Sequence, residues 1–155
     1  MTRYIPRRLT MALSFAALFV IAQLPAQAQQ TKPAAGAKGV TVTVKYSGKG
    51  TVDANHSIWV WLFNTPDINP GSIPIAEQTI EKNGGTATFA NVSPPQVYIA
   101  IAYDEKGGFA GQAPPPSGSP IVFYGAKTAK DKPQPVKPGP KTSVRVTFND
   151  AQRIQ

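Results

Sequence analysis

The sequence predicts an all-β protein, built as a single antiparallel β-sandwich of seven strands. Only 15% of its 155 residues are charged, against roughly 25% in a typical soluble domain. Short segments rich in Val, Ile, Thr and aromatic residues alternate with turns of Gly, Pro and Asn, a pattern typical of closely spaced strands. After residue 30 no stretch repeats its apolar residues every 3.6 positions, so we expect no helix there.

The first 28 residues have the features of a cleaved signal peptide. Arg3, Arg7 and Arg8 precede an apolar run over residues 11–24, and Ala26-Gln27-Ala28 supplies the small residues that signal peptidase accepts. The run is shorter than the roughly 20 residues of a membrane span, although an uncleaved anchor is the alternative. The chain has no Cys for lipid attachment. We therefore expect Sec export to the periplasm or beyond, and no stable membrane span after cleavage.

Charge and composition exclude several classes of function. Without the three Arg of the signal peptide, 13 Lys and Arg remain against 8 Asp and Glu, a net charge near +5. These basic residues are scattered and only two are Arg, whereas nucleic-acid surfaces cluster Arg and Lys on one face. The absence of Cys excludes disulfides and thiolate metal sites, and the single histidine, His56, argues against a His-based catalytic centre. We expect no nucleic-acid partner, no cofactor and no enzymatic activity.

Seven segments carry strand patterns and divide the mature chain. In GVTVTVKYSG, Val40, Val42, Val44 and Tyr46 share one face, which indicates a half-buried strand. The other strands are expected within residues 57–64, 73–80, 86–92, 97–104, 120–124 and 142–149. We expect a flexible tether over residues 29–38, the sandwich domain over 39–150 and a C-terminal tail over 151–155.

Two details of these segments predict how strands are placed. Pro74 lacks an N–H, which predicts that the strand over residues 73–80 lies at a sheet edge. The turn KNGG at residues 82–85 carries Asn-Gly, a common hairpin signal. It predicts that residues 78–81 pair with the strand that follows the turn.

The strand over residues 57–64, SIWVWLFN, is apolar on both faces. One face carries Trp59, Trp61 and Phe63, and the other carries three aliphatic residues: Ile58, Val60 and Leu62. We interpret the aromatic face as core, because aromatic residues that alternate with aliphatic ones usually pack inside. Ala100 and Ala102 of a later strand leave room for an indole ring. The alternative is that Trp59, Trp61 and Phe63 form a ligand-binding face, for example for sugar rings.

Acidic residues near two turns are the candidates for a cation site. Asp104 and Glu105 open a Gly-rich turn, and Asp53 lies in an earlier loop. Calcium takes six to eight oxygens, more than these carboxylates supply, and Lys106 adds repulsion. We interpret the segment as a solvated turn and leave a weak cation site as the alternative.

The segment over residues 125–141 combines four prolines with five lysines, which excludes a helix. We interpret it as a solvated connection with polyproline-II character. Docking on acidic polysaccharide or lipid head groups is the alternative.

The order of these segments resembles a known group of sandwiches. KYSGKGTVD, IWVWLFNTP, NGGTATFANV, YIAIAYDEKGG and SGSPIVFYG are similar to transthyretin-like (prealbumin-like) domains, including carboxypeptidase regulatory-like domains and a family of uncharacterised small secreted bacterial proteins. The resemblance covers roughly residues 39–150 and implies an Ig-like or transthyretin-like sandwich more than an activity. Within it, Tyr124-Gly125 would be the family's Tyr-Gly pair. Lys106 departs from the acidic turn of the pattern.

From these features we expect an exported, non-enzymatic accessory or binding module of the bacterial envelope that contacts a protein or a polysaccharide. The alternative is a small-ligand or carbohydrate-binding protein, or a small hydrolase, with a site formed by the sandwich loops and the aromatic face. A third hypothesis is a homo-oligomer assembled through a sheet edge, and the sequence leaves the oligomeric state open.

Overall fold

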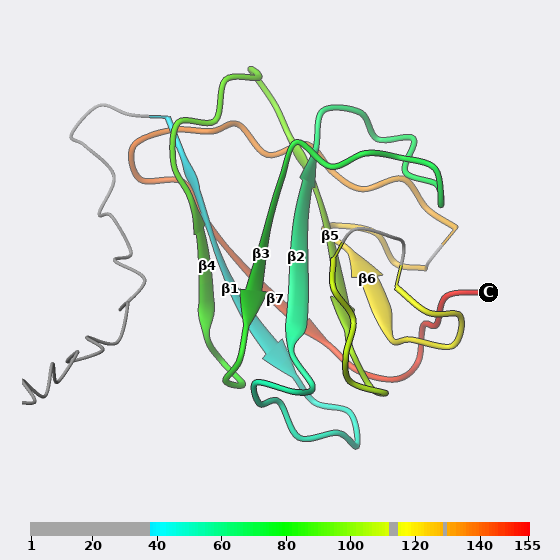
Figure 1. Ribbon diagram of the computed structural model, residues 1–155. Coiled ribbons are helices and arrows are strands. Elements are labelled where there is room, and N and C mark those ends of the chain that lie inside the picture. Colours follow the sequence, from blue (N-terminus) through cyan, green and yellow to red (C-terminus); the bar gives the residue numbers. More distant parts are fainter. Residues whose placement is uncertain (1–37, 112–114, 129) are drawn as a thin grey trace, which may run out of the picture. The chain divides into compact units, whose positions relative to one another are not determined.

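A computed structural model describes residues 38–111, 115–128 and 130–155, which form seven strands and no helix (Figure 1). The strands are β1 (Val40–Tyr46), β2 (Ile58–Phe63), β3 (Ala76–Ile80), β4 (Thr86–Phe89), β5 (Tyr98–Tyr103), β6 (Ile121–Phe123) and β7 (Ser143–Phe148). All seven lie within the predicted segments, and the all-β prediction is confirmed. The predicted signal peptide and most of the predicted tether lie outside the described residues. Within those described, no helix is long and apolar enough to cross a membrane.

The strands form two sheets. One has three strands in the order β4-β1-β7, and the other has four in the order β3-β2-β5-β6. In Figure 1 the four-stranded sheet lies in front of the three-stranded one. β3 lies at a sheet edge, as Pro74 predicted.

The prediction of a fully antiparallel sandwich is wrong at one pair of strands. β1 and β7 are parallel, with Thr41 opposite Ser143 and Tyr46 opposite Phe148. Parallel neighbours need a crossover connection, and here the rest of the sandwich forms it. Because the partners lie about a hundred residues apart, no local pattern in the sequence identifies the pair or its direction.

The predicted pairing across the Asn-Gly turn is also wrong, because β3 and β4 belong to different sheets. The turn docks on the end of β1 instead. The amide of Asn83 bonds both backbone groups of Tyr46, at 2.8 and 2.7 Å, and the Gly84 N–H donates to the carbonyl of Val44 at 3.0 Å. The positive φ of Gly84, 79°, lets the chain reverse, but the reversal carries it from one sheet to the other.

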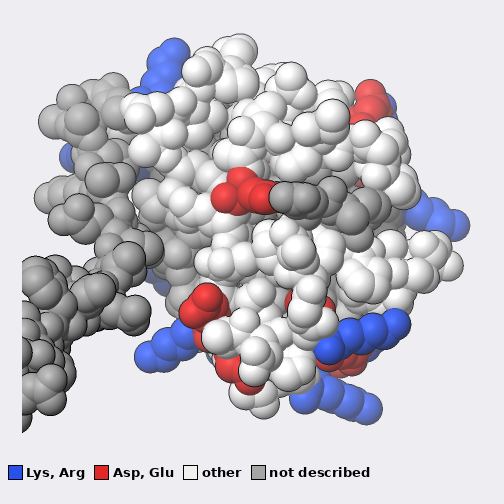
Figure 2. All heavy atoms as spheres, viewed as in Figure 1, with Lys and Arg blue, Asp and Glu red and all other residues white. Residues whose placement is uncertain are grey.

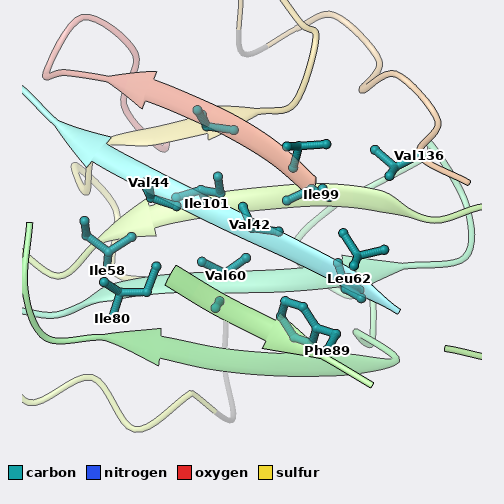
Figure 3. Close-up of a cluster of buried hydrophobic side chains, with 14 of the residues drawn as sticks. Val42, Val44, Ile58, Val60, Leu62, Ile80, Phe89, Ile99, Ile101 and Val136 are labelled. Carbon is teal, nitrogen blue, oxygen red and sulfur yellow. The ribbon is translucent and has the colours of Figure 1, made fainter. Parts of the chain in front are cut away.

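The two sheets pack face to face over one apolar core. Figure 3 shows side chains from both sheets pointing into the same space, among them Val42 and Val44 of β1, Val60 of β2 and Ile101 of β5. All four are fully buried, and each contributes roughly 1.5–3 kcal/mol by leaving water. Val136, from the Pro-rich segment, closes one side of this core and exchanges two backbone hydrogen bonds with Val97.

β5 differs from the other strands because all six of its residues are buried. One of its faces packs in the core between the sheets. Its other face therefore lies beneath a second apolar cluster, on the outer surface of the four-stranded sheet, and this cluster forms the candidate site.

Candidate ligand-binding groove

The outer face of the four-stranded sheet carries cross-strand rows fixed by the strand register. Trp59 lies opposite Ala102, and Trp61 lies opposite Ala100. Each row continues onto the edge strands, so that the first comprises Thr79, Trp59, Ala102 and Ile121 and the second comprises Glu77, Trp61, Ala100 and Phe123. A third row pairs Phe63 with Tyr98.

The two indoles fill the space left by the two alanines, as the sequence predicted. Trp59 and Trp61 stack with ring centroids 5.9 Å apart and an interplanar angle of 17°, and Phe109 meets Trp59 edge-on at 4.8 Å. Trp61 Nε1 donates to Glu77 Oε2 at 3.3 Å. Trp59 Nε1 is buried and has no hydrogen-bond partner among the described residues.

A buried carboxylate holds the loop that covers Trp59. Asp104 accepts the backbone N–H of Gly107 on one oxygen and that of Phe109 on the other, both at 2.9 Å. Gly111, which adopts a φ of 82°, passes so close to the Trp59 ring that a Cβ there would overlap it. Asp104 is thus a positioning residue that sets Phe109 and Gly111 against the indoles.

Beyond this cover, the outer face opens into a groove of about 910 Å³. Its floor comprises Trp61, Phe63, Ala100 and Phe123, and apolar residues between β2 and β3 form one wall: Ile68, Pro70, Ile73, Pro74 and Ile75. Figure 2 views this face of the molecule. Most of its described surface is uncharged, with the Lys and Arg side chains toward the margins. We name this feature the outer groove.

The far wall of the outer groove comes from the C-terminal segment, which is bound to the edge of β6. The Ile121 N–H donates to the carbonyl of Gln152 at 2.9 Å, and the Ile154 N–H donates to the carbonyl of Ser119 at 3.0 Å. Arg153, Ile154 and Gln155 therefore stand beside β6 and line the groove.

Charged side chains lie at opposite sides of the groove. Glu77 belongs to β3, whereas Arg153 stands beside β6. Lys130 comes from the segment that follows β6, and an ion pair of 2.6 Å between Lys132 and Asp67 joins this segment to the wall between β2 and β3. Arg153 forms an ion pair with Glu105 and also donates to the carbonyl of Gly118 at 2.6 Å. The hydrogen bond from Arg153 lowers the pKa of the Glu105 carboxyl.

Of the three aromatic residues predicted as a ligand-binding face, two line the outer groove and one does not. Trp61 and Phe63 line the groove and are only 5% and 6% exposed, whereas Trp59 is half-buried and packs against Phe109 and Gly111. Each indole stacks one of its faces on the other. All three belong to an apolar cluster, but on the outside of the sheet and not between the sheets.

The remaining groove residues were not identified from the sequence. Ile121 and Phe123 face the groove because β6 pairs with β5 in a particular register. Arg153 and Ile154 reach it through long-range backbone bonds. Neither arrangement has a local sequence signal, because both depend on pairing between distant segments.

The candidate cation ligands each have other partners. Asp104 bonds backbone N–H groups, and Glu105 pairs with Arg153. Asp53 accepts the backbone N–H groups of His56 and Asn55, which lower its pKa. Among the described residues, no group of three or more His, Cys, Asp or Glu side chains could hold a metal ion.

The five lysines of the Pro-rich segment are all exposed, as predicted, and within its described residues the segment contains no helix.

No protein-family model, no curated protein and no solved structure matches this chain.

Proposed function

We propose that this chain is an exported, non-enzymatic binding module of the bacterial envelope, with a transthyretin-like sandwich as its scaffold and the outer groove as its ligand site. The observation that carries the proposal is the groove itself. Its volume of about 910 Å³ falls within the roughly 300–1,000 Å³ of small-molecule sites, which are mostly apolar with a few placed polar groups.

The lining of the groove favours binding over catalysis. A general acid and base must reach the same substrate atoms, but Glu77 and Arg153 stand at opposite edges of the sheet with β2 and β5 between them. Both already have partners, since Glu77 accepts from Trp61 and Arg153 pairs with Glu105. The apolar floor between them suits a ligand held largely by burial of apolar surface.

A second candidate is that the groove receives an apolar segment of a partner protein. Ile73 is 86% exposed and Ile75 is 42% exposed, and both lie at the lip of the groove. Exposed apolar side chains next to an apolar groove extend the area that a protein partner could bury.

The test uses the mature chain, residues 29–155, and the fluorescent apolar probe 8-anilinonaphthalene-1-sulfonate. We expect the native protein to bind the probe and Ile75→Glu to weaken that binding by about tenfold, which corresponds to about 1.4 kcal/mol. Thr147→Glu is the matched control, since Thr147 is an exposed residue of β7 in the other sheet. Failure of the folded protein to bind the probe, or equal weakening by both substitutions, would overturn the proposal.

A further inference from the structure

We propose that the outer groove binds a long-chain fatty acid, with the hydrocarbon chain over the aromatic floor and the carboxylate near Lys130 and Arg153. This inference rests on the proposed function, because it names the ligand class of the same groove. Three features of the site carry it: an apolar floor, few free polar groups and an uneven distribution of charge.

The floor and lip match a hydrocarbon chain. Trp61, Phe63 and Phe123 line the groove, and the small side chain of Ala100 lies in register between Trp61 and Phe123. An acyl chain laid along this floor would also cover Ile73, which is otherwise 86% exposed. Burial of such surfaces is favourable in proportion to the apolar area that leaves water.

The polar groups of the wall between β2 and β3 are already bonded to one another. The Asn69 N–H donates to Ser72 Oγ at 2.9 Å, and Asn69 Oδ1 accepts the Gly71 N–H at 2.9 Å. Ser72 Oγ also donates to the carbonyl of Asp67 at 3.3 Å. A sugar or an extended peptide would bury many hydroxyl, N–H and C=O groups here with few partners, and each unsatisfied group is costly. A hydrocarbon chain has no such groups.

The charges assign an orientation. Two cations line the groove: Arg153 stands beside β6, and Lys130 comes from the segment that Lys132 joins to Asp67, between β2 and β3, at 2.6 Å. The groove-lining carboxylate of Glu77 belongs to β3. Arg153 is shared with Glu105, but Lys130 is exposed and forms no ion pair within the described part of the chain. A ligand carboxylate is therefore attracted to Lys130 and Arg153 and repelled by Glu77. The site favours one anionic head group at one end of one chain.

The experiment titrates mature protein with palmitate and compares 1-hexadecanol, which has the same chain without charge, and acetate, which lacks the chain. Intrinsic fluorescence reports binding, because Trp61 lines the groove, and the ¹³C shift of carboxyl-labelled palmitate reports the head group. We expect saturable binding of palmitate, weaker binding of hexadecanol and none of acetate. Lys130→Glu should weaken palmitate binding by about two- to fivefold, the range for loss of one exposed ion pair, and leave hexadecanol unchanged. Lys137→Glu, an exposed lysine of the same Pro-rich segment that does not line the groove, is the control.

The outcomes separate this inference from the proposed function. If the apolar probe binds at the groove but palmitate does not, the fatty-acid inference is wrong and the proposed function stands. Equal affinities for palmitate and hexadecanol, or no change with Lys130→Glu, would overturn the assigned anionic head group. Absence of both probe and palmitate binding would overturn the two proposals together.

Discussion

At the scale of single residues, a tyrosine and a carboxylate hold the end of β7 against β1. Tyr46 Oη donates to the carboxylate of Asp150, and the Lys49 N–H donates to its other oxygen at 3.1 Å. The tyrosine bond is the first cause of a lowered pKa at Asp150, and burial together with this partner raises the pKa of Tyr46. Because the carboxyl has a lower pKa in the folded chain than in the unfolded chain, ionised Asp150 stabilises the fold at neutral pH.

We expect Tyr46→Phe to lower the free energy of unfolding by about 1.5–3 kcal/mol at pH 7, the range for a hydrogen bond to a charged group. The stabilisation is full above the unfolded pKa, near 3.9, and is lost as the pH falls through the lowered pKa of folded Asp150. Urea unfolding between pH 7 and pH 2.5 should therefore show the unfolding free energies of the native protein and Tyr46→Phe converging in acid.

Tyr98→Phe is the control. The Tyr98 hydroxyl accepts from the uncharged Gln96 amide at 2.8 Å, so the loss of this bond should cost the same at every pH. A difference for Tyr46→Phe that persists unchanged to pH 2.5 would contradict this account.

At the scale of elements, the existence of β2 and its two apolar faces were predicted from its sequence. Alternation alone assigned Ile58, Val60 and Leu62 to one apolar cluster and Trp61 and Phe63 to another. This worked because successive side chains of a strand point to opposite faces whatever the partner strands are. Partner choice is not a local property. The Asn-Gly signal before β4 was present and was misread, because β4 pairs with β1 and β3 with β2.

Trp61→Ala tests whether the outer cluster stabilises the sheet. Trp61 stacks on Trp59, lies over Ala100 and is 5% exposed. We expect a loss of about 3–5 kcal/mol in the free energy of unfolding, the usual cost of deleting a buried aromatic ring. Chemical denaturation measures it, and Thr79→Ala, an exposed position on β3, should change little. A loss below about 1 kcal/mol for Trp61→Ala would contradict the assignment of this ring as core.

At the scale of the whole described domain, the outer groove forms because the two faces of the four-stranded sheet are covered unequally. The inner face of the four-stranded sheet is covered by three strands, whereas its outer face is covered by the loop that Asp104 holds and by side chains of the wall residues and C-terminal segment. The aromatic residues of this face were predicted from alternation. The groove was not, because its walls come from loops and from the tail at residues 151–155, which carries no strand pattern in the sequence. The sequence of the strands could indicate that the outer face of the sheet is apolar, but it could not show that the loops leave part of this face open as a groove.

Export is a property of the full-length chain, and it can be tested directly. Three arginines, an apolar run and Ala26-Gln27-Ala28 predict cleavage after Ala28, which would leave a chain that begins at Gln29. We expect the full-length chain, produced in a Gram-negative host, to appear in the periplasmic fraction with the intact mass of residues 29–155. Replacing both Ala26 and Ala28 by Leu removes the small residues that the peptidase accepts, so this variant should keep its full mass and sediment with membranes. Wild-type chain found at full mass in either the cytosol or the membrane would contradict the signal-peptide assignment. It would also contradict the proposal that the chain works as a binding module in the envelope.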